Sequence, residues 1–340
     1  MTPLRIAVLI HRDLIPPEKI PQGTDLEHAE WSTEYDVIHN LRKMGHEVKI
    51  IGVHDDLGPI RSAVHRFKPH CTFNLLEEFA NEALFDQHVV SYLELLHTAY
   101  TGCNPRGLTL ARDKALAKKI LTYHKIPTPK FCVFPANRNV KKPSSLQYPL
   151  IVKCLNEEAS LGISQASVVH NDEKLEERVS FIHEKFGVDA IAESFIKGKE
   201  VYVGILGNYR LQTLTPWELR FEHSEDAGKE VYSTAAKFDK TYRKRKGVKT
   251  GKAKVSDELT KQLATMAKRT YRALSLSGYA RIDFRIDEDK KIWVLEANPN
   301  PDIARKDEFA ESAKYDGVDY HTLLNKLLSL GRQWLKKPSN

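Results

Sequence analysis

The segment 278–301 constrains what this chain can fold into more than any other stretch. Its first half alternates apolar and charged residues, the period of two that is typical of a half-buried β-strand, and 292–297 forms a second apolar-rich run. Between them stands Asp-Glu-Asp-Lys-Lys, a sequence typical of turns. The segment therefore predicts an antiparallel hairpin with a loop at 288–291, in which Asp287 pairs with Ile292.

The expected register brings charged and amide side chains to one face of the hairpin. It places Asp283 opposite Glu296 and Arg281 opposite Asn298. Directly opposed side chains lie roughly 5 Å apart, where two carboxylates repel each other unless a cation joins them. Two carboxylates and an amide oxygen form a ligand set suited to Mg²⁺, which is held by few protein carboxylates together with waters and substrate phosphates. The alternative is a surface hairpin with scattered charges.

The bulk composition is that of a globular chain. Its 340 residues are enough for two or three domains, and no apolar run approaches the roughly 18 residues that would indicate a membrane span. The short apolar run at 4–10 is followed by charged residues without a cleavage site, so it predicts a first buried strand and not a signal peptide. Four scattered cysteines without metal-binding spacing indicate reduced thiols, and we expect a cytoplasmic protein.

The net charge of +7 is concentrated in one segment, which we expect to form a loop. Between Lys237 and Lys254 stand nine Lys or Arg and one Asp. A segment of this kind attracts phosphates, either those of a nucleotide or those of a polynucleotide backbone. From 242 to 254 Tyr242 is the only aromatic residue, so the stacking series of a nucleic-acid binder is missing, and we do not expect nucleic acid as the partner.

The order of strand and helix patterns divides the chain. The first hundred residues alternate strands (4–10, 47–53, 70–75) with helices (33–44, 57–67, 84–96), which predicts a parallel, Rossmann-like sheet. No Gly-x-Gly-x-x-Gly follows the first strand, so a dinucleotide site is not supported. A helix is expected at 109–123, and antiparallel strands with further helices follow. The strands are expected at 150–154, 162–169, 190–194, 200–206 and 210–214, and the helices at 172–185, 256–274 and 320–330.

Two further segments carry side chains suited to a nucleotide. Lys153 ends a buried-looking strand, and the loop 156–162 after it could cover phosphates with backbone N–H groups. Glu193 and Glu200 bracket the apolar pair Phe195–Ile196, which suits an apolar wall for a base and a carboxylate for ribose hydroxyls. The alternatives are a lysine that reaches solvent and a linker with ordinary surface glutamates.

In combination these segments resemble the ATP-grasp superfamily, and within it the D-alanine–D-alanine ligase branch. The resemblance runs from about Leu4 to Leu330. It is carried, in chain order, by Tyr100-Thr101-Gly102, Arg112-Asp113-Lys114, Pro149–Lys153, Glu193 with Glu200, Ala235-Ala236-Lys237, Arg281-Ile282-Asp283 and Glu296-Ala297-Asn298-Pro299-Asn300-Pro301. It implies a mixed α/β and α+β ATP-grasp fold with an N-terminal Rossmann-like preATP-grasp domain at 1–105. A linker helix and lid subdomain at 106–190 and a C-terminal ATP-grasp subdomain at 191–335 would follow.

The resemblance also implies roles for individual residues. Cofactor-binding residues would be Lys114, Lys153, Ser160, Glu193, Phe195, Ile196, Glu200, Lys237 and Leu295, the metal ligands Asp283, Glu296 and Asn298, and the catalytic residues Arg281 and Lys237. The cofactors would be ATP and one or two Mg²⁺ ions, with Mn²⁺ as a substitute. Such enzymes transfer the γ-phosphoryl group of ATP to a carboxylate, and an amine then attacks the acyl phosphate. The branch is often dimeric, so a homodimer is an open alternative.

The amino-acid-binding positions depart from the D-alanine ligases. Their lid loop contains Glu-Gly-Ser-Ser where this chain has Glu157-Glu158-Ala159-Ser160, and Phe238 stands where they have a tyrosine. Asp302 takes the place of a glycine, and Asp307 that of the serine which would receive a substrate carboxylate. The N-terminal acid that would hold the first substrate has Glu27 or His28 as its nearest counterpart.

We therefore expect an amide-forming carboxylate–amine ligase whose substrates are not two D-alanines. The carboxylates of Asp302 and Asp307 would repel a carboxylate and attract an amine or another cation. One alternative is a D-alanine–D-alanine ligase of cell-wall synthesis. The other is a non-enzymatic protein that binds nucleotides or nucleic acid.

Overall fold

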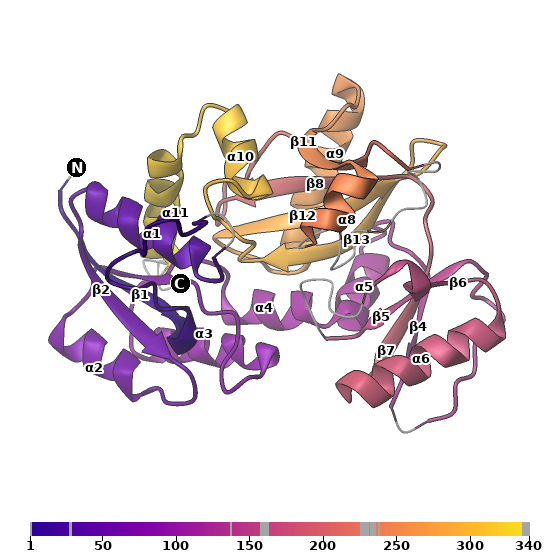
Figure 1. Ribbon diagram of the computed structural model, residues 1–340, viewed down its shortest axis with the longest axis horizontal. Coiled ribbons are helices and arrows are strands. Elements are labelled where there is room, and N and C mark those ends of the chain that lie inside the picture. The colour runs from indigo at the N-terminus through magenta and orange to yellow at the C-terminus, as the bar shows by residue number, and fades with distance from the viewer. Residues whose placement is uncertain are drawn as a thin grey trace.

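A parallel three-stranded sheet opens the chain, as its alternating pattern predicts. The computed structural model describes residues 2–26, 29–136, 138–156, 163–224, 231, 236 and 239–334 (Figure 1). In the first sheet β1 (Arg5–His11) lies between β2 (Glu47–Val53) and β3 (Cys71–Asn74), and both pairings are parallel. The connecting helices are α1 (Ser32–Lys43), α2 (Gly58–Arg66) and α3 (Asp86–Leu95). The Rossmann-like arrangement is therefore confirmed.

The single helix expected at 109–123 is wrong. The structure has two helices, α4 (Pro105–Arg112) and α5 (Lys114–Tyr123), with Asp113 between them. Asp113 leaves the helical conformation (ψ 101°), and its Oδ1 accepts a hydrogen bond from the backbone N–H of Leu116 at 2.8 Å. An aspartate in this position caps a new helix and satisfies one of its free N–H groups. In Figure 1 the two helices lead from the first sheet toward the second.

The second sheet is antiparallel and has its own core. Its strand order is β4-β7-β5-β6, with β6 reduced to two residues. The strands are β4 (Phe131–Phe134), β5 (Leu150–Cys154), β6 (Val168–Val169) and β7 (Ala190–Ser194). Helix α6 (Asp172–Phe186) packs Leu175, Val179 and Ile182 into this core. The strand expected at 162–169 is mostly wrong, because a 3₁₀ turn at Gln165–Ser167 takes up its middle.

The third sheet holds the hairpin that the sequence singles out. Its strands run in the order β11-β10-β8-β12-β13, with β9 beside β8, and all pairings are antiparallel. They are β8 (Lys199–Leu206), β9 (Gln212–Thr213), β10 (Trp217–Phe221), β11 (Val248–Lys252), β12 (Tyr279–Ile286) and β13 (Ile292–Pro299). The expected strand at 210–214 shortens to β9, and the sequence did not predict β10 or β11.

The basic segment is not the loop that its composition indicates. Within its described part, helix α8 (Lys240–Lys246) and strand β11 carry most of the cations. Asp239 caps α8 by accepting hydrogen bonds from the N–H groups of Thr241 and Tyr242 at 2.8 and 2.9 Å. Gly247 ends the helix with a positive φ of 60°, which glycine adopts without strain.

Three more helices cover the third sheet and join it to the first. They are α9 (Asp257–Ala273), α10 (Glu308–Tyr315) and α11 (Tyr320–Trp334). Apolar residues of α10 and α11 pack together with Ile6 and Val8 of β1 and Tyr279 of β12 in one core. The first and third sheets are thus held by a shared apolar core. None of the helices that the structure describes has the length and apolarity needed to cross a bilayer.

Candidate active site

The β12–β13 hairpin has the facing pairs that the sequence predicts. Asp283 lies opposite Glu296 and Arg281 opposite Asn298. The end near the turn differs, because Ile286 and not Asp287 pairs with Ile292.

The shift arises in the turn itself. The Asp287 carboxylate accepts hydrogen bonds from the Lys291 N–H and from Trp293 Nε1, both at 2.8 Å, so Asp287 closes the turn and does not continue the ladder. The register then changes by one residue between Asp283 and Phe284, where Leu295 is the extra residue on β13. This β-bulge restores the predicted pairing in the half of the hairpin that carries the carboxylates.

The bulge also gives Leu295 a polar role. Its carbonyl accepts a hydrogen bond from Nζ of Lys118 at 3.0 Å, and this lysine also donates to Thr128 Oγ1 at 3.1 Å. Nζ of Lys118 lies 3.2 Å from Oε2 of Glu193, and Nζ of Lys153 lies 3.6 Å from the same oxygen. All three charged side chains are buried, with exposed fractions of 2%, 10% and 1% for Lys118, Lys153 and Glu193.

The buried cluster therefore holds two lysines and one carboxylate. Burial alone would lower the pKa of Lys153, but the carboxylates of Glu193, Glu296 and Glu200 outweigh it and raise that pKa. Lys153 thus stays charged at neutral pH. Neither oxygen of Glu193 receives a hydrogen bond from a described residue, although both are buried. A buried cluster of two lysines and one carboxylate suits a molecule that combines phosphates with N–H or O–H donors.

Lys118 is the functional candidate that the sequence reasoning missed. Glu193 pairs with Lys118 and Lys153, whereas the two lysines expected on phosphates were Lys114 and Lys153. Lys114 is the first residue of α5 and is half-buried. Residues four apart in a helix share a face, so the spacing of the two lysines was the available signal.

The residues expected around a nucleoside come together through an arginine. Arg285 on β12 donates through Nη1 to the Ile196 carbonyl at 2.9 Å, and its guanidinium lies 4.9 Å from the centre of the Phe195 ring. Its Nη2 is 3.6 Å from Oε2 of Glu200, which also accepts a hydrogen bond from the Tyr202 hydroxyl through Oε1 at 3.0 Å. Arg285 alternates with Arg281 and Asp283 along the strand, which was a signal for its position on the same face.

Asp283 lies at the centre of a buried polar network. Arg281 donates to its two oxygens from Nε at 2.8 Å and from Nη2 at 3.0 Å, and Asn298 donates from Nδ2 at 2.9 Å. Nη1 of Arg281 donates to Glu308 at 3.2 Å. Burial raises the pKa of Asp283 to about 7; Arg281 opposes this shift, and Glu296 adds to it.

These side chains fit a divalent cation. The described residues contain no group of three His, Cys, Asp or Glu placed to hold a metal. The candidate ligands are the facing carboxylates of Asp283 and Glu296, together with the amide of Asn298. Mg²⁺ commonly binds through few protein oxygens and completes its shell with waters and phosphates. The raised pKa of Asp283 also favours cation binding. Burial and the nearby Glu296 make the charged carboxylate unfavourable, and a bound cation would neutralise it.

The two aspartates expected to bind substrate lie in the segment between β13 and α10. Asp302 is exposed and accepts hydrogen bonds from Thr33 Oγ1 at 2.7 Å and from the Ala304 N–H at 2.8 Å. Asp307 caps α10 by accepting from the Glu308 N–H at 2.5 Å. Burial, Asp302 and Glu308 raise the pKa of Asp307 well above its usual value.

Glu34 on α1 belongs to the same acidic region and was not predicted. It is buried, with 5% exposed, and burial raises its pKa to about 7, with a contribution from Asp302. Eight residues with predicted roles or departures lie outside the described residues: Glu27, His28, Glu157, Glu158, Ala159, Ser160, Lys237 and Phe238.

Comparison with known proteins identifies relatives of this chain. A family model described as D-ala D-ala ligase C-terminus matches residues 120–329. A D-alanine–D-alanine ligase of Bordetella petrii is 30% identical over 238 residues, which cover 70% of this chain and 69% of that protein. An uncharacterized protein of Sinorhizobium fredii, y4sG, is 28% identical over 326 residues, or 94% of this chain and 90% of that protein.

The fold is also that of solved ligases. The structure of a D-alanine–D-alanine ligase from Bacillus anthracis complexed with ATP superposes with a TM-score of 0.76, covering 98% of this chain and 99% of that chain at 22% identity. The expected ATP-grasp fold is therefore confirmed. The chain belongs to the D-alanine–D-alanine ligase family, whose members are ATP-dependent ligases that form C–N bonds.

Proposed function

We propose that this chain is an ATP- and Mg²⁺-dependent carboxylate–amine ligase whose substrates are not two D-alanines. The proposal that the substrates are not two D-alanines rests on the acidic region beside Arg281. This region is formed by Glu34, Asp302, Asp307 and Glu308. A free amino acid that approached with its carboxylate would meet the exposed Asp302 carboxylate. An amine would be attracted, and its positive charge would offset the burial that raises the pKa of Glu34 and Asp307.

The ATP end of the site follows from the buried clusters. In this proposal Lys118 and Lys153 contact phosphates, with Lys114, Ser160 and Lys237 as further contacts. Glu193, Glu200, Leu295 and the pair Phe195–Ile196 surround the nucleoside, and Asp283, Glu296 and Asn298 hold Mg²⁺. The metal would supply neutralisation of phosphate charge. The protein's part is to position the groups and to stabilise the charge that develops during phosphoryl transfer.

The reaction would proceed in two steps. A substrate carboxylate oxygen forms a bond to the γ-phosphorus of ATP, and the bond from that phosphorus to the β-phosphate oxygen breaks, so that ADP leaves. The amine of the second substrate, in its neutral form, then attacks the acyl carbon. Inorganic phosphate leaves with the former carboxylate oxygen, and the nitrogen of the new amide releases one proton to water. Arg281 stands between the metal carboxylates and the acidic region, bonded to Asp283 and Glu308, and so is placed to stabilise the acyl-phosphate charge.

The pairing of β7 bears on how the chain divides. A lid that ended at residue 190 would separate β7 from β4 and β5, the strands with which it pairs. We therefore place the boundary between the lid and the C-terminal subdomain after Ser194, and retain the preATP-grasp domain at 1–105.

A screen for Mg²⁺-dependent phosphate release from ATP tests the proposal. Amino acids and amines would be supplied in pairs, and the products identified by mass spectrometry. We expect a carboxylate–amine pair other than two D-alanines to give the highest kcat/KM. Preferred turnover of D-alanine alone would show a D-alanine–D-alanine ligase. Binding of polynucleotides that falls steeply with salt, without any ATP turnover, would show the non-enzymatic alternative.

Variants of the acidic region sharpen the test. Asp302→Gly and Asp307→Ser should raise KM for the amine acceptor by about tenfold, the effect of one lost charged contact, with little change in KM for ATP. Asp257→Ser is the matched control, because Asp257 is an exposed aspartate in the first turn of α9. Unchanged acceptor kinetics in both variants would remove the basis for an amine site here.

A further inference from the structure

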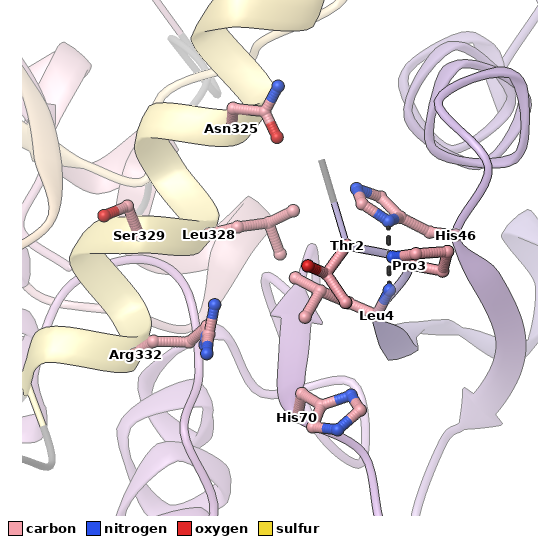
Figure 2. Close-up of a pocket in the computed structure, with 9 residues that line it drawn as sticks. All are labelled: Thr2, Pro3, Leu4, His46, His70, Asn325, Leu328, Ser329 and Arg332. Carbon is pink, nitrogen blue, oxygen red and sulfur yellow. Dashed lines mark hydrogen bonds between the residues drawn. The ribbon is translucent and has the colours of Figure 1, made fainter.

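A pocket lies between the N-terminal segment and helix α11, and no candidate active-site residue lines it. Figure 2 shows this pocket, which has a volume of about 520 Å³. It is lined by Thr2, Pro3, Leu4, His46, His70, Asn325, Leu328, Ser329 and Arg332. None of these lining residues is acidic.

Backbone hydrogen bonds determine which nitrogen of each histidine carries the proton. The Leu4 N–H donates to Nδ1 of His46 at 3.3 Å, and the Arg5 N–H donates to Nδ1 of His70 at 2.8 Å. A neutral imidazole has one N–H, so a ring that accepts through Nδ1 carries its hydrogen on Nε2. Burial lowers the pKa of both histidines, with Arg5 and Arg332 adding to the effect at His70. Both rings are therefore neutral Nε2–H donors near pH 7.

The donor of His46 is buried and unused. His46 is 7% exposed, and its Nε2 has no hydrogen-bond partner among the described residues. In Figure 2 this nitrogen points toward α11, across the pocket. Native proteins leave few buried N–H groups unpaired, so an acceptor atom is expected here.

Arg332 supplies the positive charge. It stands in the last turn of α11, and it makes no hydrogen bond or ion pair with any residue that the structure describes. The preceding residue, Gly331, lets this end of α11 pack closely against the backbone of Tyr100, because an added Cβ would overlap the Tyr100 carbonyl oxygen. A guanidinium and two N–H donors, with no carboxylate among the lining residues, make a site for an oxyanion.

We propose that this pocket binds a small molecule through a phosphate or carboxylate group, held by Arg332 and by the Nε2–H groups of His46 and His70. The volume lies within the range of small-molecule sites and exceeds the needs of a free ion. Leu4 and Leu328 provide an apolar surface for the remainder of such a ligand.

Inorganic phosphate is the probe for the test. Two-dimensional ¹H–¹⁵N spectra of the imidazole rings should show the Nε2–H tautomer for His46 and His70, with signals assigned through His46→Gln and His70→Gln. Added phosphate should shift both signals saturably at constant ionic strength. Acetate in a parallel titration distinguishes a carboxylate group from a phosphate group, and saturable binding of either supports the site.

Two arginine variants and one control separate the site from general charge effects. Arg332→Ala should weaken phosphate affinity by at least about tenfold, the usual effect of losing one charge-assisted hydrogen bond, and Arg332→Lys should retain part of it. Lys326→Ala removes a cation from the same helix at a residue that does not line the pocket, and should leave the affinity unchanged. Identical spectra in phosphate and chloride, or equal loss in Arg332→Ala and Lys326→Ala, would overturn the proposal.

Discussion

Replacing Lys118 by methionine should destabilise the protein strongly, because it breaks a buried ion pair. At the observed 3.2 Å between Nζ and Glu193 Oε2, and an effective dielectric constant of about 20, the attraction is about 5 kcal/mol. Removing the ammonium also removes its own desolvation cost, and Lys153 still neutralises Glu193 from 3.6 Å. We therefore expect a loss of about 3 kcal/mol in the free energy of unfolding, the lower end for breaking such a pair.

Urea denaturation followed by circular dichroism measures this loss. Lys119→Met is the matched control, since Lys119 is the next residue of α5 and is exposed, and it should change the free energy by less than about 0.5 kcal/mol. A double-mutant cycle with Glu193→Gln should give a coupling energy of about 2 kcal/mol. In the same variants the Kd for ATP should rise at least about tenfold if Lys118 contacts phosphate.

Two results would refute this reasoning. Equal stability of Lys118→Met and Lys119→Met would show that the buried pair contributes nothing. Additive effects of Lys118→Met and Glu193→Gln would show that the two side chains act independently, despite their distance.

Two further predictions concern Asp283 and a tight approach of two loops. Because burial raises the pKa of Asp283 to about 7, the folded state binds a proton more tightly than the unfolded chain, and stability is lost as pH rises from about 4 to about 7. Without Mg²⁺, the urea midpoint of the wild type should therefore fall relative to that of Asp283→Asn as the pH rises through this window. A difference between the two midpoints that does not change with pH would contradict the raised pKa of Asp283. Gly278→Ala should cost about 3 kcal/mol, because φ is 72° and a Cβ would overlap the Gly102 carbonyl oxygen. Gly317→Ala has φ of 78° in open space and should cost only about 1 kcal/mol, so equal losses would contradict the steric account.

Local patterns predicted much of the fold because they have a direct geometric meaning. Alternation with a period of two gave the strands of the hairpin, and the facing pairs Asp283–Glu296 and Arg281–Asn298 are as expected. The βαβαβ order gave the parallel first sheet. These features depend on neighbours in sequence, which a single chain shows.

Other features depend on contacts that sequence spacing does not reveal. The pairing of Lys118 with Glu193 requires α5 to pack beside two sheets, and the bulge at Leu295 depends on how Asp287 closes the turn. The break before α5 was predictable, since Asp113 is a strong capping residue, but the continuous helical pattern outweighed it.

In the basic segment a local signal outweighs composition. A run of lysine and arginine indicates a solvated loop, yet Asp239 and Gly247 at its ends are the residues that begin and end a helix. The segment forms helix α8 between these two capping residues.

The bulge at Leu295 divides the hairpin into two parts whose strand pairing differs in register by one residue. On the turn side of the bulge Ile286 faces Ile292, and on the other side Asp283 faces Glu296. Leu295 is the one residue of β13 left unpaired between these two parts. Since side chains alternate strictly along a strand, a slip of one residue would turn Glu296 to the opposite face of the sheet. The extra residue corrects such a slip before it reaches the carboxylates. The turn at 287–291 is therefore where the hairpin can change length, or accept an inserted label, without disturbing the residues proposed to hold the metal.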